Sequence, residues 1–427
     1  MTMIDWLAKK VLLSRCPSIQ GGTLSLTNET GRHCFGQTIA RNDSRGRDGL
    51  EASITVHDDG FYRRTLLGSD IGLGESYMEG EWSTPDLVTL TRLMIRNLAL
   101  VEEGGGVVRN VVSRAGGLAR RLRDNSITGS RRHIREHYDL GNDFFRLFLD
   151  EWLMYSSAYY ESGRETLEQA QQNKLDAVCR KLGLGPRDHV LEIGTGWGGF
   201  AVWAATRYGC RVTTTTISEE QYRHARDWVA RLGDVGTRIT VLLTDYRQLE
   251  GQFDKIVSIE MFEAVGLRHY DEYFGAVDRL LKPDGSMLMQ TITVDEQHFP
   301  RYHGAPDWIE KYIFPGGELA SIGEVVASVG RATSMSVYHA ENFGSHYART
   351  LHEWRARYRR QLDRVRAMGF SERFIRMWDL YLAFCEAAFL ERHAGVFQLV
   401  LNKNYSGAVH FNEPWTVADA QSASAVA

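Results

Sequence analysis

The stretch HVLEIGTGWGGFAVWAA, residues 189–205, decides the fold. Its apolar start predicts a buried strand, the glycines predict a tight turn, and the run after them predicts a helix. Glycines in such a turn let the backbone approach a ligand closely at the N-terminus of the helix. The stretch therefore predicts a cofactor site beside the first strand of an α/β domain.

Strands alternate with helical patterns from about residue 175 onward. Helical stretches over 345–368 and 371–391 precede the last predicted strand. This alternation favours a parallel, doubly wound sheet. KPDG (282–285) is expected to be a turn before the fifth strand. The predicted strands are 188–193, 210–216, 239–243, 254–259, 286–292, SMSVYHAENF (334–343) and VFQLVLNK (396–403).

Residues 1 to about 110 follow a different pattern. MTMIDWLAKKVLLSRC (1–16) predicts a helix rather than a signal peptide. Residues 84–100 predict another helix, with Thr84 as its cap and Pro85 in its first turn. The stretches 22–31, 52–68 and 71–82 predict short strands that are separated by turns rich in Gly, Asn and Asp.

These patterns predict four segments. They are a smaller α+β N-terminal domain (1–112), a basic linker (113–136), the main domain (137–415) and a disordered small-residue tail (416–427).

The composition limits the class of protein. The 427 residues are 43% hydrophobic and 24% charged, as is ordinary for a soluble globular chain. A net charge of -4 and the lack of an RNA-binding motif argue against nucleic acid as a partner. The five scattered cysteines form no CxxC or Cys/His cluster, so neither a disulfide framework nor a metal site is expected and a reducing cytoplasm fits. No uncharged apolar run reaches the length of a membrane span.

The glycine turn leaves more than one cofactor open. Gly194, Gly196 and Gly199 satisfy the dinucleotide pattern GxGxxG. A nicotinamide site also expects an acid about twenty residues later, where this chain has Thr213–Thr216. Three features favour S-adenosylmethionine instead: Glu192 before the first glycine, Asp245-Tyr246 after the third strand, and two late strands that complete the sheet. A purely structural glycine turn remains the alternative.

Several blocks resemble cyclopropane-fatty-acyl-phospholipid synthases, in order over about residues 130–402. This resemblance implies a class I methyltransferase fold: a Rossmann-like, mostly parallel seven-stranded sheet with a helical substrate cap. The blocks are HYDLGNDFFRLFLDEWLMYSSAYY (137–160), LEIGTGWGGF (191–200), TISEEQ (216–221), DYRQL (245–249), IVSIEMFEAVG (256–266), WIEKYIFPGGELAS (308–321) and ENFGSHYARTLHEW (341–354).

The resemblance implies a reaction on lipid. The methyl carbon of S-adenosylmethionine is transferred to a cis double bond of an unsaturated phospholipid acyl chain, by way of a carbocation. The product is a cyclopropane or a methylene- or methyl-branched chain. Aromatic faces attract such a cation, and the candidates are Trp308, Tyr312, Phe314 and Tyr347. A plain core role is at least as good an account of each one alone.

The resemblance also implies a base. In the family this is bicarbonate, here expected to be held through Glu263, the backbone near Ile292, and Tyr347. Three further catalytic positions depart from the cyclopropane formers: Ser157 replaces a cysteine, Gln290 replaces a histidine, and Glu260 replaces the glycine of many members. Both bicarbonate and ring closure are therefore left open, and the pattern is closer to the methylene- or methyl-branching members.

The cofactor residues follow from the same resemblance. Glu260 could also lie beside the cofactor rather than act in catalysis. The expected cofactor-binding residues are Tyr155, Ser156, Glu192, Gly194, Gly196, Thr216, Ile217, Gln221, Asp245, Tyr246, Arg247 and Ile259.

An enzyme that acts on acyl chains has to meet a membrane, and the resemblance implies that the N-terminal domain (1–112) is associated with lipid. Two basic runs could contact an anionic surface, and a solvated helix face is the alternative for each. We expect a cytoplasmic protein, peripheral on the inner face of the membrane, with a homodimer left open. The alternatives in function are N-methylation of a small amine and an inactive lipid-binding protein. The runs are Arg114, Arg120, Arg121, Arg123, Arg131, Arg132 and Arg135, and then Arg355, Arg357, Arg359, Arg360, Arg364 and Arg366, beside Leu351, Trp354 and Tyr358.

Overall fold

A computed structural model of the chain describes residues 2–37, 49–98, 140–303 and 307–403. The expected linker (113–136) and tail (416–427) lie outside these residues. The chain divides into two compact units, each described here by itself. The first contains Met1–Asp150, Ile292–Ile322 and Phe343–Val396, and the second contains Glu151–Thr291, Gly323–Asn342 and Phe397–Ala427. The domain boundaries expected from the sequence stay a prediction.

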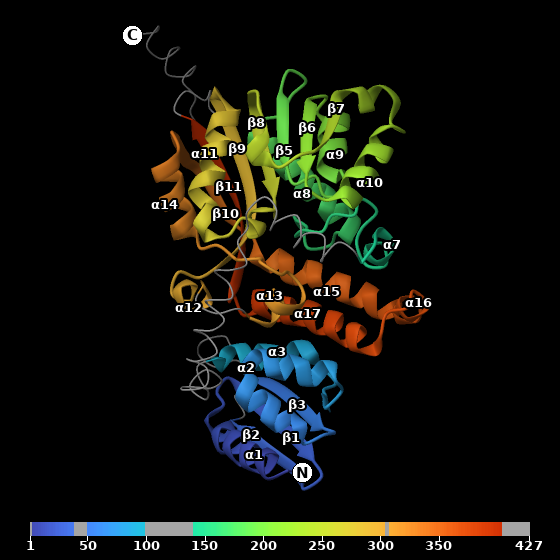
Figure 1. Cartoon of the computed structure of the whole chain (residues 1–427), viewed down its shortest axis with the longest axis vertical. Coiled ribbons are helices and arrows are strands. Elements are labelled where there is room, and N and C mark those ends of the chain that lie inside the picture. Colours follow the sequence, from blue (N-terminus) through green and yellow to red (C-terminus); the bar gives the residue numbers. More distant parts are fainter. Residues whose placement is uncertain (1, 38–48, 99–139, 304–306, 404–427) are drawn as a thin grey trace. The chain divides into compact units, whose positions relative to one another are not determined.

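The second unit is built on a seven-stranded sheet in the order β10-β11-β9-β8-β5-β6-β7 (Figure 1). The pairs β5/β6, β5/β8, β6/β7 and β8/β9 are parallel, whereas β10 and β11 are antiparallel. The predicted mostly parallel seven-stranded sheet is therefore confirmed. The strands are β5 (His189–Ile193), β6 (Arg211–Thr216), β7 (Ile239–Leu243), β8 (Phe253–Ile259), β9 (Leu281–Val294), β10 (Met335–Asn342) and β11 (Ala394–Lys403).

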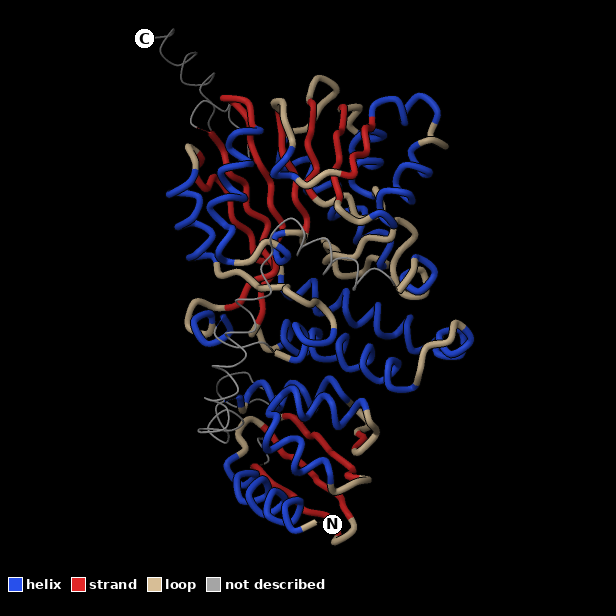
Figure 2. The backbone as a smooth tube through the Cα atoms, viewed as in Figure 1, coloured by secondary structure: helices blue, strands red, loops and turns tan. Residues whose placement is uncertain are grey.

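Helices pack around this sheet (Figure 2). Its core joins Val190 of β5, Val257 of β8 and Leu288 of β9 to Val178 of α8 and Phe200 of α9, all nearly inaccessible to solvent. Burial of these apolar side chains is the main stabilising contribution. The helices are α8 (Leu167–Leu182), α9 (Gly199–Arg207), α10 (Glu219–Val229), α11 (Tyr270–Leu280) and α14 (Ile322–Ala332).

The KPDG segment corrects one boundary. Phe253 of β8 pairs with Leu281, and Lys255 already pairs with Ser286. Residues 282–285 are therefore a bulge inside β9 rather than a turn before it. The turn residues do bend the chain, but pairing with β8 resumes on both sides of the bend.

The N-terminal part of the first unit is a four-stranded sheet in the order β2-β1-β3-β4. β1 pairs antiparallel with β2 and parallel with β3, which gives the α+β arrangement that was expected. The elements are α1 (Met3–Arg15), β1 (Gly22–Asn28), β2 (Gly31–Gly36), β3 (Leu50–Val56), α2 (Gly60–Met78), β4 (Trp82–Ser83) and α3 (Leu87–Arg96).

The prediction of strands is wrong for residues 60–78, because these residues form α2, whereas Trp82 does lie in β4. Two glycines there allow close packing rather than a turn. A Cβ at Gly72 would lie 1.9 Å from the Arg64 carbonyl oxygen, and one at Gly74 would lie 2.4 Å from the Trp308 ring. The helix is also kinked at Ser69, whose φ is 53°.

The cap of α3 was also misplaced. The Asp86 side chain accepts a hydrogen bond from the Thr89 backbone N–H at 3.1 Å. The Thr84 hydroxyl instead accepts from the Asp86 backbone N–H at 3.3 Å. Asp86 is therefore the N-cap, and Thr84 supports it from outside the helix.

The remaining helices complete the first unit. α17 packs against α15 and α3. Glu391, just after α17, accepts hydrogen bonds from Arg92 and Arg96 of α3, each at 2.7 Å. Among the described residues, no helix is long and apolar enough to cross a bilayer. These helices are α7 (Asn142–Phe145), α12 (Phe299–His303), α13 (Trp308–Tyr312), α15 (Gly344–Arg360), α16 (Leu362–Ala367) and α17 (Glu372–Leu390).

Candidate functional site

The glycine turn lies between β5 and α9, as predicted. Gly194 has a φ of 101° and donates its N–H to the Thr215 carbonyl at 3.0 Å. Gly196 has a φ of 52°, and no described atom lies within 4 Å of the place where its Cβ would be. The first position needs glycine for its backbone conformation. The second leaves open space beside the turn, as a ligand would require.

Glu192 precedes this turn and is 3% exposed. Burial raises its pKa to about 8, although Thr214 and Lys174 act in the opposite direction. Its Oε2 atom has no hydrogen-bond partner among the described residues. A buried acceptor of this kind calls for a donor from a ligand. The amino and hydroxyl groups of S-adenosylmethionine are such donors, so the residues fit that cofactor.

Ser156 is held from α8. The fully buried Lys174 donates from Nζ to the Ser156 hydroxyl at 2.7 Å, and Gln171 donates to the Ser156 carbonyl at 2.9 Å. Tyr155, one residue earlier, is half-buried, as is Ile259 at the end of β8. The sequence did not single out Lys174 or Gln171.

The end of β6 and the start of α10 form one hydrogen-bonded group. The Thr216 hydroxyl donates to Gln221 Oε1 at 2.8 Å, and the Ser218 side chain accepts from the Gln221 N–H at 3.3 Å. Ile217 lies between them and is half-buried. The structure thus brings together three residues expected to face the ribose or methionine.

Asp245 is neutralised by a local ion pair. Arg247 donates from Nε and Nη2 to the two carboxylate oxygens, each at 2.8 Å, and Asp245 is 2% exposed. Tyr246 lies between these residues, with its ring centroid 5.3 Å from that of Tyr273. Burial raises the pKa of the Tyr246 hydroxyl. A role of these residues beside an adenine stays a prediction.

Ser157, Glu260 and Gln290 form one group, called here the Glu260 cluster. Glu260 Oε1 accepts from the Gln290 side-chain amide at 2.7 Å and from the Ser157 backbone N–H at 2.9 Å. Ser157 and Gln290 are fully buried. The Ser157 hydroxyl donates to the Ala158 carbonyl at 3.1 Å, so Ser157 contacts Glu260 through its backbone.

The backbone of Glu260 is unusual. Its φ is 49°, in the left-handed region that glycine adopts without cost. Its N–H donates to the Gln290 carbonyl at 2.7 Å, which continues the pairing of β8 and β9 beyond the strand. Backbone strain of this kind is often found at functional sites. Glu260 is also the position at which the family resemblance leads us to expect glycine in many cyclopropane formers.

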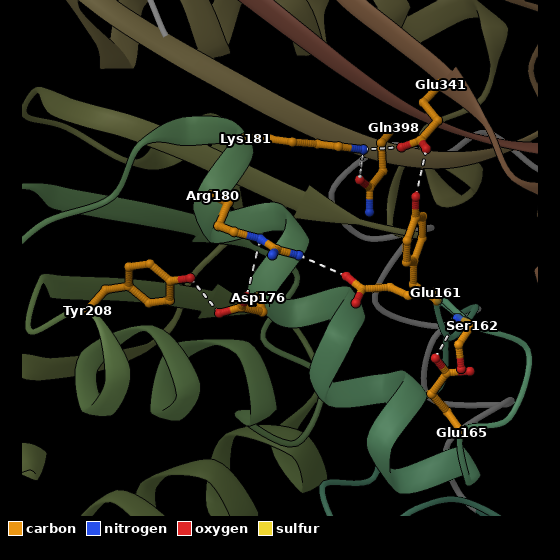
Figure 3. A network of polar contacts seen from close by, with 10 residues as sticks. Glu161, Ser162, Glu165, Asp176, Arg180, Lys181, Tyr208, Glu341 and Gln398 are labelled. Carbon is orange, nitrogen blue, oxygen red and sulfur yellow. Dashed lines mark hydrogen bonds and ion pairs between the residues drawn. The ribbon is translucent and has the colours of Figure 1, made fainter. Parts of the chain in front are cut away.

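Sequence reasoning missed a buried polar series that leads away from the Glu260 cluster. Figure 3 shows the end of this series at Lys181, Gln398 and Glu341. Gln398 of β11 donates to Gln290 Oε1 at 2.9 Å, and Lys181 of α8 donates to Gln398 Oε1 at 2.5 Å. Lys181 also donates to Glu341 of β10, which accepts from the Tyr159 hydroxyl. One signal could have found it: Lys174 and Lys181 lie on the buried face of α8, where apolar residues are expected.

Glu263 lies three residues after Glu260, in the short 3-10 helix Phe262–Ala264. It is half-buried, and its Oε1 accepts from the Thr291 hydroxyl at 3.0 Å. Ile292 and Tyr347 belong to the first unit, whereas Glu263 belongs to the second. A joint bicarbonate site therefore stays a prediction.

The four aromatic candidates lie in the first unit and have packing roles there. Tyr347 is buried and stacks on Phe389, with centroids 4.6 Å apart. The Tyr312 hydroxyl donates to Glu75 at 2.6 Å. Trp308 is buried against α2, and Phe314 contacts Tyr381 edge-on at 5.9 Å. Their contact with a cation stays a prediction.

The second basic run differs from the expected mixture of basic and apolar surface. Leu351, Trp354 and Tyr358 are buried. Arg355 forms an ion pair with Asp379 at 2.8 Å, and Arg366 forms one with Glu372 at 2.6 Å. The first run, from Arg114 to Arg135, lies outside the described residues. In the part of the chain that the structure describes, no group of acidic, His or Cys side chains could hold a metal ion.

Comparison with known proteins identifies the family. The pattern of the mycolic acid cyclopropane synthetase family matches residues 125–399. The chain is 38% identical over 365 residues to tuberculostearic acid methyltransferase UfaA1 of Mycobacterium tuberculosis, covering 82% of this chain and 83% of that protein. It is 39% identical over 355 residues to cyclopropane-fatty-acyl-phospholipid synthase of Escherichia coli, with coverage of 82% and 88%.

A solved structure agrees with these relatives. The mycolic acid cyclopropane synthase CmaA1, complexed with SAH and CTAB, is 35% identical with a TM-score of 0.59, covering 64% of this chain and 98% of that one. The family pattern covers residues 125–399, so it includes the strand, glycine turn and helix of residues 189–205. The chain belongs to the mycolic acid cyclopropane synthetase family and is an S-adenosylmethionine-dependent methyltransferase of the cyclopropane-fatty-acyl-phospholipid synthase type.

Proposed function

We propose that this methyltransferase acts on a cis double bond of an unsaturated phospholipid acyl chain and makes a methylene branch rather than a cyclopropane. The names of its relatives support a lipid substrate. Identities of 38% to a tuberculostearic acid methyltransferase and 39% to a cyclopropane synthase do not separate the two products. The observation that carries the choice is the Glu260 cluster, because all three departures from the cyclopropane formers lie in it.

Each acidic residue has a separate task in this proposal. S-adenosylmethionine, when bound, supplies an electrophilic methyl group, whose bond to sulfur breaks as the acyl double bond attacks. Glu260 stabilises the positive charge left on the acyl chain, because an anion held in place by fixed donors needs no reorganisation. Its charge favours migration of a hydride, which places the cation on the methyl-bearing carbon. Glu263 then takes a proton from that methyl group, and the methylene branch results.

A glycine at position 260 would supply no anion at this place. Without it, loss of a proton directly after methyl transfer closes the ring. A saturated methyl branch would further require a separate hydride donor, which we do not assign to this chain. Bicarbonate held at Glu263 remains an expectation from the family resemblance.

Liposomes of an unsaturated phospholipid, mixed with the purified chain and methyl-labelled S-adenosylmethionine, test the proposal. We expect label in the acyl fraction, a mass gain of one methylene unit, and one double bond that is retained, now at the branch, and that catalytic hydrogenation removes. A cyclopropane NMR signature would contradict the product, and an unlabelled acyl fraction would contradict the substrate. Label in an added small amine would instead support an N-methyltransferase. Cofactor binding without turnover would support an inactive lipid-binding protein.

We also propose that this enzyme meets anionic headgroups as a peripheral protein. Arg359, Arg360 and Arg364 are exposed at the end of α15 and in α16, and each basic residue near such a surface contributes about 1 kcal/mol. Leu351, Trp354 and Tyr358 of α15 are buried, so the attraction expected of these arginines is electrostatic. Co-sedimentation with anionic vesicles should therefore be lost in high salt and in the triple Arg→Gln variant. Salt-resistant binding would contradict the assignment.

A further inference from the structure

We propose that Lys181 is a positioning residue for the Glu260 carboxylate, and that it acts through the side-chain amides of Gln398 and Gln290. The inference rests on the proposed function, in which Glu260 stabilises charge on the acyl chain. It concerns residues that the family resemblance did not single out: Lys181 on α8 and Gln398 on β11.

The contacts form an unbroken series through the interior of the second unit. Lys181 Nζ lies 2.5 Å from Gln398 Oε1, Gln398 Nε2 lies 2.9 Å from Gln290 Oε1, and Gln290 Nε2 lies 2.7 Å from Glu260 Oε1. Gln398 and Gln290 are fully buried, and Lys181 is 5% exposed. Water therefore does not compete for these groups, and each hydrogen bond is stronger than it would be at the surface.

The charged groups at the two ends of the series fix the direction of every bond in it. An amide alone can present either its oxygen or its nitrogen, and the two orientations look alike in shape. An ammonium group only donates, so Gln398 has to turn its oxygen toward Lys181 and its nitrogen toward Gln290. Gln290 must then accept with its oxygen, which leaves its nitrogen as the donor to Glu260. A carboxylate only accepts, so Lys181 and Glu260 require the same orientation of both amides, and the lysine reinforces the donor that faces the carboxylate.

Lys181 is itself anchored on its other side. It forms an ion pair with Glu341, and Glu341 accepts from the Tyr159 hydroxyl at 2.8 Å. Burial lowers the pKa of Lys181, and the bond to Glu341 opposes that effect. Burial and Glu341 together raise the pKa of Tyr159 to about 12, so Tyr159 stays a donor. The pair holds the charge of Lys181 at the start of the series.

Removing this charge should change the rate more than the affinities. Without Lys181, Gln398 can reverse and turn its oxygen toward the Gln290 oxygen, which removes the donor that holds the Gln290 amide in place. A displaced amide no longer fixes the carboxylate that the reaction needs, while the glycine turn and the residues of the cofactor site keep their own contacts. The expected signature is a lower kcat with little change in KM for lipid or in the Kd of S-adenosylmethionine.

Two variants of different kinds test this. Lys181→Met removes the charge and keeps the length of the side chain. Gln398→Glu strengthens the contact with Lys181 but places an oxygen, instead of a donor, against Gln290. It therefore removes the hydrogen bond to Gln290 while a side chain of the same size still fills the position. We expect each to lower kcat about tenfold, the effect of losing one charge-assisted contact. KM and the Kd of S-adenosylmethionine should stay within about twofold of the native values.

A matched control lies near the same helix. The Tyr208 hydroxyl donates to Asp176 of α8, away from the amide series (Figure 3). Tyr208→Phe removes a hydrogen bond to α8 and should leave kcat unchanged. A loss in Tyr208→Phe equal to that in Lys181→Met would mean that any disturbance of α8 lowers the rate, and would overturn the assignment.

The background Glu260→Gly separates positioning from a general structural role. With no carboxylate to position, Lys181→Met should lower kcat no further there. The same tenfold loss in this background, or an unchanged kcat in a folded Lys181→Met or Gln398→Glu protein, would overturn the inference. Both results presuppose native turnover on unsaturated phospholipid. If the native chain lacks that turnover, the proposed function fails first, and the failure is distinguishable because it precedes any substitution.

Discussion

Two acidic side chains in the second unit follow strands of the same sheet and are held in opposite ways. Asp245, after β7, is bound through both oxygens by Arg247, two residues along the chain. Glu260, after β8, accepts from an amide and a backbone N–H that are distant in the sequence. The ion pair holds the Asp245 carboxylate in one position and neutralises its charge. The donors at Glu260 are neutral, so they hold the carboxylate in place and leave its negative charge for the reaction.

Glu263 follows Glu260 by three residues and is expected to act as the base that takes the proton. Its substitution should therefore have the largest effect among the acidic side chains compared here. Glu263→Gln should lower turnover about a thousandfold, the scale of a lost general base. The Kd of S-adenosylmethionine should stay within about twofold of the native value. Single-turnover assays and calorimetry measure the two quantities. A weakened affinity with normal chemistry would place this carboxylate beside the cofactor instead.

Glu192 represents a third way of holding a carboxylate, namely by burial. Its pKa of about 8 in the folded chain lies above the ordinary 4.5, so the folded state binds more protons between these values. Its contribution to stability is present at low pH and is lost as the pH rises toward 8. Glu192→Gln cannot lose a proton, so its stability relative to the native chain should improve by about 3 kcal/mol from pH 5 to pH 8. Denaturant unfolding without cofactor measures this, and an equal difference at both pH values would contradict it.

Asp245→Asn should remove the buried carboxylate from the Arg247 guanidinium, whose side chain is 10% exposed, while the longer contact of Arg247 with Glu272 at 3.7 Å remains. We expect a loss of about 2 kcal/mol in the free energy of unfolding, the cost of an inadequately paired charged group. Adding Arg247→Gln should recover part of that loss. Thermal unfolding of the single and double variants measures this. If the stability changes of the two single variants simply add in the double variant, the two side chains are not coupled.

Relief of the backbone strain at Glu260 should give the smallest change in stability. Arg392, exposed in the first unit, has a φ of 56°, close to the 49° of Glu260. Arg392→Gly should stabilise the chain by about 1 kcal/mol, since glycine removes the left-handed strain. Glu260→Gly should gain less, because Ser157 and Gln290 lose their acceptor, and its product should shift toward the ring. Equal gains in the two variants, measured by denaturant unfolding, would show that the hydrogen bonds to Glu260 add nothing.

Local signals predicted the sheet and the glycine turn well. β5, β6 and β7 lie within one residue of their predicted bounds, because apolar runs and glycine turns act over neighbouring residues. The same reasoning failed for α2, where Gly72 lies against the Arg64 backbone of the same helix and Gly74 lies against Trp308, which is distant in the sequence. A glycine in the sequence does not reveal whether it allows a turn or a close approach.

The candidate site divides in the same way. Thr216 and Gln221, and likewise Asp245 and Arg247, are near each other in the chain, and their contacts could be anticipated. Lys181 and Gln398 are separated by 217 residues. A buried lysine is recognised as part of a site only when its partner is known, and that partner comes from the last described strand. The resemblance to a family indicated the positions of Ser157, Glu260 and Gln290, but not that they would contact one another.

The position of β11 has a consequence for biosynthesis. It is the last described strand along the chain, yet it lies inside the sheet between β9 and β10. While the ribosome elongates the chain, the edges of β9 and β10 that face β11 remain without a partner and are open to aggregation until residues 394–403 emerge. Gln398 arrives with the same strand. Completion of the sheet and assembly of the polar series that ends at Glu260 are thus a single late event. A nascent chain stalled before β11 is therefore both prone to aggregation and inactive.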